Sequence, residues 1–179
     1  LKYATAQERR ADTLEFVSTV DGLTQCLNHR AFHDVLQHEL EAAAHGGPGF
    51  CLMMIDIDHF KDINDTHGHV TGDRVLADIG QLLQVTTRAI DAVGRIGGEE
   101  FAILLRRTEL ERATELAERL RQEVSIAKPA GIRVTISAGV SEYWVDATVP
   151  QLRRHTDRLL YTAKASGRDT VIAGPPPFR

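Results

Sequence analysis

The chain has 179 residues, 42% of them hydrophobic and 26% charged, and its formal net charge is −4 at pH 7. These values are typical of one soluble globular domain that can bury a core without disulfides. The acidic balance argues against a nucleic-acid-binding protein, which usually has a basic excess, but it permits small phosphate ligands. Cys26 and Cys51 lack metal-ligand spacing and indicate reduced thiols in the cytosol.

The N-terminal residues suggest a connector. Because the chain begins with Leu1 rather than Met, we expect it to be a piece of a longer protein. Residues 4–18 are charged and carry apolar residues at helical spacing, which predicts an amphipathic helix over 1–20 that leads in from an upstream sensor or receiver module. No stretch approaches the roughly 20 apolar residues that span a bilayer. We therefore expect a cytoplasmic domain, and any membrane anchor of the parent protein would lie outside this sequence.

Helix and strand patterns then alternate along the chain. Asn28 is suited to begin a helix that ends near Ala44, before the glycine-rich run 45–49. The almost unbroken apolar run 50–57 predicts a central strand buried on both faces. Thr71 is expected to cap the helix that follows.

The second half of the chain continues this alternation. The expected elements are a hairpin of strands at 92–96 and 101–105, a helix over 109–124, a strand over 132–140, a helix over 151–166 and a short strand over 170–173. Interleaved strands and helices predict an α/β fold, an α+β sandwich in which helices pack on a central sheet. We expect one folded domain over 21–174 and a disordered, proline-rich tail over 175–179.

Acidic residues gather at the end of the apolar strand and at the hairpin turn. Asp56 and Asp58 are two residues apart, so on a strand they point to the same side. If the hairpin, with Glu99 and Glu100, is the neighbour of that strand, three or four carboxylates converge, and like charges so close need a compensating cation. Oxygen ligands favour Mg²⁺ over zinc or copper. For any one of these acids alone, a turn cap or a solvated hairpin residue is the simpler interpretation.

Candidate phosphate-binding groups lie near these acids. Gly97 and Gly98 lack side chains, so their backbone N–H groups can approach a phosphate, although most Gly-Gly pairs are simple turns. Lys61, Lys164 and Arg168 could hold a triphosphate. Taken alone, a cation near a helix C-terminus more often only complements the helix dipole.

Four groups of residues together resemble the GGDEF family of diguanylate cyclases. They are Asp21-x-Leu23-Thr24 with Asn28, the D-x-D-x-F-K-x-x-N-D segment from Asp56 to Asp65 with Gly68-His69 and Gly72-Asp73, the GGEEF run from Gly97 to Phe101, and Leu160-Tyr161-x-Ala163-Lys164 with Gly167-Arg168. The match covers about residues 20–173, and the order of several motifs makes chance a poor explanation. It implies a catalytic domain over 21–174 with a mostly antiparallel sheet flanked by helices, similar to the palm-like fold of nucleotidyl cyclases and polymerases.

The resemblance implies condensation of two GTP molecules into cyclic di-GMP with release of pyrophosphate. Mg²⁺, with Mn²⁺ as an alternative, would be bound by Asp56, the Ile57 carbonyl, Glu99 and Glu100. Glu99 would also be the general base for a 3′-hydroxyl, and Lys61 would stabilise the charge that develops on phosphate. Each domain would hold one GTP, so the active species would be a symmetric homodimer.

The substrate contacts are also implied by the resemblance. They are Gly97, Gly98, Lys164 and Arg168 for the phosphates and Asn64, His69 and Asp73 for guanine. The edge of guanine offers two adjacent N–H donors and an ionised Asp73 only accepts, whereas adenine would present a lone pair to it. Relatives that make the mixed cyclic GMP-AMP typically have Ser in place of this Asp, so Asp73 favours GTP alone.

A second site is implied by Arg88-Ala89-Ile90-Asp91, which matches the R-x-x-D inhibitory motif of the family. Arg can form a bidentate pair with phosphate or guanine, and Asp can accept from guanine N–H groups. Cyclic di-GMP bound there would lower the rate, with Arg119 as a third contributor. Without the family context, Arg88 and Asp91 are an ordinary surface pair at a helix end.

The sequence departs from the family pattern in peripheral places. Gln25-Cys26 and Asn28-His29-Arg30 stand where Gly-Leu and two Arg are usual, and Asp169 stands where Asn is common. Ser137 has no assigned base, so we expect a strand residue rather than a nucleophile. The main alternative function is a catalytically silent module that binds GTP or cyclic di-GMP, which the retained acids disfavour. The input signal cannot be inferred.

Overall fold

The computed structural model describes residues 18–177. The connector helix predicted over 1–20 therefore lies outside the described residues except for its last three positions, and nothing tests it. Within the described residues, no helix combines the length and the apolar character needed to cross a membrane.

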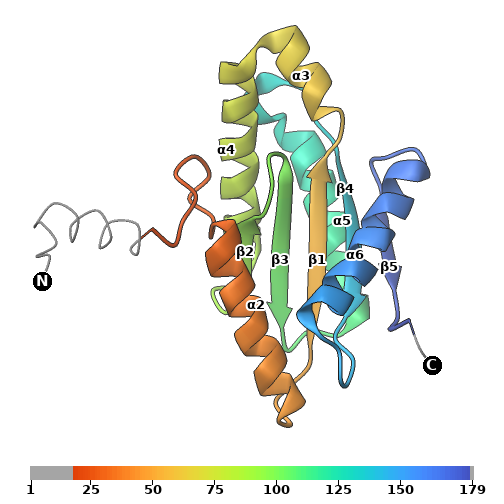
Figure 1. Cartoon of the computed structure of the whole chain (residues 1–179). Coiled ribbons are helices and arrows are strands. Elements are labelled where there is room, and N and C mark those ends of the chain that lie inside the picture. Colours follow the sequence, from red (N-terminus) through yellow and green to blue (C-terminus); the bar gives the residue numbers. More distant parts are fainter. Residues whose placement is uncertain (1–17, 178–179) are drawn as a thin grey trace, which may run out of the picture.

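One sheet forms the centre of the described residues, and its strand order is β2-β3-β1-β4-β5 (Figure 1). The strands are β1 (Phe50–Ile57), β2 (Ala92–Arg95), β3 (Glu100–Arg106), β4 (Ile136–Glu142) and β5 (Val171–Gly174). β1 pairs antiparallel with both β3 and β4, β2 pairs antiparallel with β3, and only the β4–β5 pair is parallel. The predicted mostly antiparallel sheet and its Gly-Gly hairpin are confirmed.

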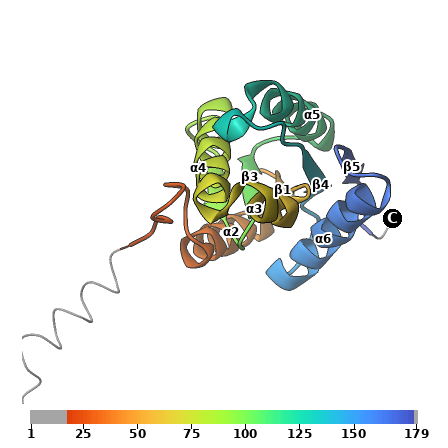
Figure 2. The same cartoon turned by 90° about the horizontal axis from the view of Figure 1, so that it is seen from above.

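Two pairs of helices cover the two faces of this sheet (Figure 2). They are α2 (His29–Ala44) with α6 (Val149–Ala165) on one face, and α4 (His69–Thr86) with α5 (Leu110–Ala127) on the other. Successive side chains of a strand point to opposite faces, so β1 serves two cores. Met53 and Ile55 pack with the α4 and α5 side, whereas Leu52 and Met54 pack with the α2 and α6 side. Every residue of β1 is buried, as its apolar run predicted.

Local signals explain most helix boundaries. Asn28 caps α2, because its side chain accepts from the Ala31 N–H at 2.9 Å. Thr148 and Gln151 form a capping box at α6, so this helix begins two residues before the predicted start. The predicted helix over 109–124 is α5, which runs three residues further.

The predicted start of the helix after β1 was wrong. A short helix, α3 (Phe60–His67), precedes it, and α4 begins at His69 rather than after Thr71. Gly68 joins them with φ of 85°, a left-handed conformation that glycine adopts without steric strain. The strand expected over 132–140 begins only at Ile136.

Candidate active site

Four segments meet at the upper end of the sheet in Figure 1: the end of β1, the start of α3, the β2–β3 turn and the end of α6. Asp56 on β1 lies opposite Glu100 on β3, and the Ile57 N–H donates to the Glu99 carbonyl at 3.3 Å. The signature turn is therefore the direct neighbour of the acidic strand end, which meets the condition on which the convergence of the acids depended.

Asp56 is a buried carboxylate surrounded by charge, with 6% of its surface exposed. The Lys164 ammonium at the end of α6 donates to its Oδ2 at 2.7 Å. Burial raises the pKa of Asp56, the nearby Glu99 and Glu100 carboxylates raise it further, and the Lys164 contact opposes the rise. The acids are thus close enough to repel one another, and a cation stabilises their ionised forms.

The donor set of this end fits a hard divalent cation, because it consists of carboxylate and carbonyl oxygens. Within residues 18–177, no three His, Cys, Asp or Glu side chains are already gathered as a metal site. Lys164 is instead the positive partner of Asp56. Glu99 and Glu100 are half-buried, and Glu100 Oε2 lies 2.6 Å from the position of a Cβ built on Gly97.

Asp58 does not join this cluster, so of the three or four acids expected to converge only Asp56, Glu99 and Glu100 lie close together. Its carboxylate is 4% exposed and accepts from the hydroxyls of Thr135 and Ser137 at 2.8 and 2.7 Å. A third bond comes from the backbone N–H of Asp169 at 2.9 Å. Ser137 lies on β4 with its hydroxyl committed to Asp58, which agrees with its interpretation as a strand residue.

The Gly-Gly turn is held by a side chain that precedes it. Arg95 donates from Nε and from a terminal nitrogen to the Gly98 carbonyl at 3.1 and 2.8 Å. Its other terminal nitrogen pairs with Asp21 at 3.1 Å. Burial raises the pKa of Asp21, but hydrogen bonds from Thr24 and Arg95 outweigh it and lower the pKa overall. The segment that enters the domain is thereby connected to the signature turn.

The residues expected to read guanine lie on the adjoining helices. Asn64 is on α3, and His69 and Asp73 are in the first turns of α4. A Cβ added at Gly72 would lie 1.9 Å from Asn64 Oδ1, so only glycine lets Asn64 pack against α4. The turn between α3 and α4 therefore brings Asn64 beside the helix that carries Asp73. Lys61 is exposed on the first turn of α3.

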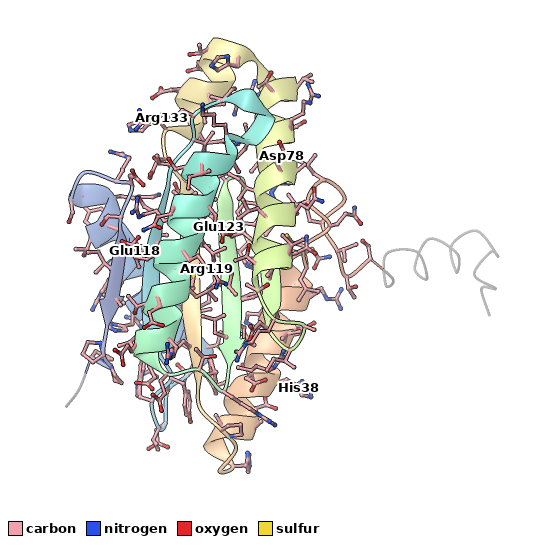
Figure 3. The ribbon with its side chains drawn as sticks, turned by 180° about the vertical axis from the view of Figure 1, so that it is seen from behind. His38, Asp78, Glu118, Arg119, Glu123 and Arg133 are labelled. Carbon is pink, nitrogen blue, oxygen red and sulfur yellow. The ribbon has the colours of Figure 1, made fainter. Side chains whose placement is uncertain are left out.

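The residues of the R-x-x-D motif lie at the other end of the hairpin. Arg88 forms a bidentate pair with Asp91 at 2.9 and 2.8 Å and also donates to the Arg106 carbonyl at 2.7 Å. The Asp91 side chain is 0% exposed, whereas that of Arg88 is 53% exposed. Arg119 on α5, labelled in Figure 3, donates to the carbonyl of Thr86, two residues before Arg88.

Comparison with known proteins decides the family. The family model described as "Diguanylate cyclase, GGDEF domain" matches residues 18–170. The chain belongs to this family. The diguanylate cyclase DgcM of Escherichia coli (strain K12) is 37% identical over 170 residues, which are 94% of this chain and 42% of that protein. The diguanylate cyclase DgcP of Pseudomonas aeruginosa is 37% identical over 155 residues, 84% of this chain and 23% of that protein. The chain thus spans less than half the length of these relatives.

Solved GGDEF-domain structures share the fold. The coiled coil and GGDEF domain of DgcB from Caulobacter crescentus, in complex with c-di-GMP, aligns with a TM-score of 0.85 and 33% identity over 94% of this chain and 93% of that one. The active GGEEF domain of a diguanylate cyclase from Vibrio cholerae aligns with a TM-score of 0.78 and 34% identity over 83% and 96%. The expected palm-like fold and the resemblance to the GGDEF family are confirmed.

Sequence reasoning missed two residues that shape the site, Arg95 and Gly72. Arg95 lies two residues before Gly97, and a charged residue at that place was the one available signal. Its partner Asp21 is 74 residues away, a distance that no local pattern reveals. Gly72 was noted only as part of a motif, and its packing against Asn64 depends on the turn at Gly68.

Proposed function

We propose that this domain is a diguanylate cyclase, which condenses two GTP molecules into cyclic di-GMP and releases two pyrophosphates. The observation that carries the proposal is Asp56, a buried carboxylate with raised pKa that lies beside Glu99, Glu100 and a Gly-Gly turn. A site of this kind suits phosphoryl chemistry, in which positioning and charge stabilisation do most of the work. The named activities of DgcM and DgcP support the same conclusion.

The carboxylates would hold Mg²⁺, with Mn²⁺ as an alternative. Asp56, the Ile57 carbonyl, Glu99 and Glu100 are the proposed ligands, and the bound ion would neutralise charge on the attacking and leaving oxygens. Glu99 would accept the proton of the 3′-hydroxyl as general base. Lys61, exposed at the start of α3, would stabilise the charge of the reacting phosphate.

The substrate would lie across the upper end of the sheet. Lys164 would leave Asp56 and bind the β and γ phosphates together with Arg168. The N–H groups of Gly97 and Gly98 would approach the same phosphates. Asn64 and Asp73, with His69 beside them, would accept from or donate to the guanine edge.

Turnover would need two copies of the domain. Each copy holds one GTP, and the 3′-hydroxyl of one attacks the α-phosphate of the other, so a homodimer is the proposed active species. Cyclic di-GMP would also bind at Arg88, Asp91 and Arg119 and slow the reaction. We further propose a cytoplasmic location and control by an upstream sensor or receiver module.

Product formation from GTP and Mg²⁺ across a wide range of protein concentration tests this proposal. We expect cyclic di-GMP to appear at a rate that climbs faster than the protein concentration. Binding of GTP or cyclic di-GMP without turnover, even with two domains held together by a fused coiled coil, would show a silent receptor module instead.

A further inference from the structure

Asp58 is a buried carboxylate that the proposed chemistry leaves unused. It directly follows β1, two residues after Asp56. Its Oδ1 accepts from the Ser137 hydroxyl, and its Oδ2 accepts from both the Thr135 hydroxyl and the Asp169 N–H. A carboxylate that is withdrawn from water and lacks a cation needs such donors. Two of the donors come from the segment at the start of β4 and the third from the loop after α6.

That loop has an unusual backbone. Gly167, Arg168 and Asp169 have φ values of 113°, 65° and 45° in succession. A left-handed conformation is unfavourable for residues that carry a Cβ, so Arg168 and Asp169 keep it only because their surroundings hold it. Asp58 holds the Asp169 N–H, and Arg121 holds the Asp169 carboxylate at 2.6 Å.

The same loop carries the proposed phosphate-binding cations. Lys164 lies at the end of α6, and Arg168 is the residue directly before Asp169. Within residues 18–177, the Arg168 side chain is exposed and has no hydrogen-bond or ion-pair partner. Its backbone sets the point from which the side chain extends. That backbone is held on both sides, because the Arg168 N–H donates to the Ala163 carbonyl at 3.2 Å and the next N–H, that of Asp169, donates to Asp58.

We propose that Asp58 is a positioning residue: through the Asp169 N–H it holds the C-terminal side of the left-handed Arg168 backbone, whose N–H is held by Ala163, and so aligns the triphosphate half of the GTP site with Asp56. The end of β1 then serves both halves of the site, because one carboxylate faces the metal-binding cluster and the next orients the phosphate-binding loop. This inference rests on the proposed role of Arg168 at the β and γ phosphates.

Two substitutions separate hydrogen bonding from the mere presence of a side chain. Asp58→Asn keeps an oxygen that accepts from the Asp169 N–H, and its amide can donate to the Ser137 hydroxyl, which accepts as well as donates. Asp58→Ala removes every one of these bonds. Asp62→Ala is the matched control, because it removes an exposed acid four residues further along.

The first test does not depend on the proposed function. Amide hydrogen exchange of the whole chain is followed by NMR for each variant. In Asp58→Ala, the Asp169 amide should exchange roughly tenfold faster or more, while the amides of β1 and β3 stay protected. Asp58→Asn and Asp62→Ala should resemble the unmodified chain. An unchanged Asp169 rate in Asp58→Ala overturns the proposal.

The second test compares two ligands. Asp58→Ala should bind a non-hydrolysable GTP analogue about tenfold more weakly in the presence of Mg²⁺, yet bind GMP, which lacks the β and γ phosphates, as before. Adding Arg168→Ala to Asp58→Ala should weaken the analogue little further, because both act on one contact. If GMP and the analogue lose affinity equally, the substitution has disturbed the whole binding site, and the proposal is overturned. If Arg168→Ala alone weakens neither ligand, the proposed role of Arg168 fails, and the exchange result still decides what Asp58 does to the loop.

Discussion

Asp56 and Asp58 lie two residues apart at the end of β1, yet their surroundings give them different chemistry. Asp56 faces one ammonium and two neighbouring glutamates, so its ionised form depends on a cation. Asp58 accepts three hydrogen bonds from neutral donors and needs no cation. The surroundings of Asp56 therefore suit metal binding, whereas those of Asp58 suit a carboxylate that holds a backbone segment in place.

At the residue scale, Glu99 is the first side chain to test. Glu99→Gln keeps the shape but removes the charge and the proton acceptor, so turnover should fall at least ~100-fold while the fold is retained. Initial rates with saturating GTP and Mg²⁺ measure the effect, and circular dichroism checks the fold. Glu111→Gln, at an exposed position of α5, should leave the rate unchanged. Persistent activity in Glu99→Gln would remove Glu99 from both of its proposed roles.

Gly72 gives a second prediction at this scale. Alanine at an interior helix position usually stabilises a helix by about 1 kcal/mol relative to glycine. Here the new Cβ would displace the Asn64 amide, whose Oδ1 lies 1.9 Å from its position. We expect Gly72→Ala to raise the KM for GTP roughly tenfold, the loss of about one hydrogen bond to the base.

Gly49→Ala is the control for this change, because a Cβ there meets nothing within 4 Å. Steady-state kinetics and thermal unfolding of both variants give the comparison. A Gly72→Ala protein with greater stability and an unaltered KM would show that the position of Asn64 does not matter for GTP.

At the scale of elements, the hairpin turn depends on the segment that enters the domain. Arg95 donates two bonds to the Gly98 carbonyl and pairs with Asp21. Arg95→Ala should lower the free energy of unfolding by about 1–2 kcal/mol and lower kcat/KM roughly tenfold, because the turn loses its anchor. Urea unfolding and kinetics measure the two effects.

Arg112→Ala removes an exposed arginine that pairs with Glu115 on α5, and it should change neither quantity measurably. Asp21→Asn should reproduce part of the Arg95→Ala effect, since it weakens the same anchor from the other side. If kcat/KM stays constant in Arg95→Ala while stability falls, Arg95 is a structural residue without influence on the turn.

The elements that sequence patterns predicted are those with a strong local signal. The apolar run of β1, the Asn28 cap of α2 and the Gly-Gly hairpin each depend on neighbouring residues, and each is confirmed. Helix α3 has eight residues, a single buried side chain, Ile63, and no side-chain cap at His59, so neither periodicity nor capping announces it.

The candidate site was predictable as a set of motifs but not as a geometry. The partners of Asp58 are 77, 79 and 111 residues away along the chain. Period-two alternation predicted that Asp58 points to the same side as Asp56. It could not show that hydroxyls from the start of β4 and a backbone N–H would donate hydrogen bonds to the Asp58 carboxylate. Contacts of this kind depend on strand order, which no local pattern determines.

At the scale of the whole molecule, one hairpin joins two proposed sites. Glu100 begins β3 beside the signature turn, and Arg106 ends it beside the R-x-x-D motif, where the Arg106 N–H donates to Asp91 at 3.1 Å. A strand of this length spans on the order of 20 Å. Under the proposed inhibition, product bound at the motif would therefore not reach the signature turn of the same domain, and it would act through the hairpin or through the arrangement of two domains.

Arg88 tests this arrangement. Its guanidinium is half exposed, and its Nε and Nη2 donors are taken up by Asp91, Arg106 and Thr108. Among residues 18–177, Nη1 makes no hydrogen bond, so it is the atom that can donate to a phosphate or a guanine edge while the pair with Asp91 stays intact. In Arg88→Ala, half-maximal inhibition should require at least ~10 times more cyclic di-GMP, while the initial rate changes little. Because Arg88 also bonds the Arg106 carbonyl, thermal unfolding must accompany the inhibition curves. Arg119→Ala, which leaves the Arg88–Asp91 pair intact, should weaken inhibition less. A folded Arg88→Ala domain that cyclic di-GMP inhibits as before would show that the motif is a structural ion pair and that product acts elsewhere.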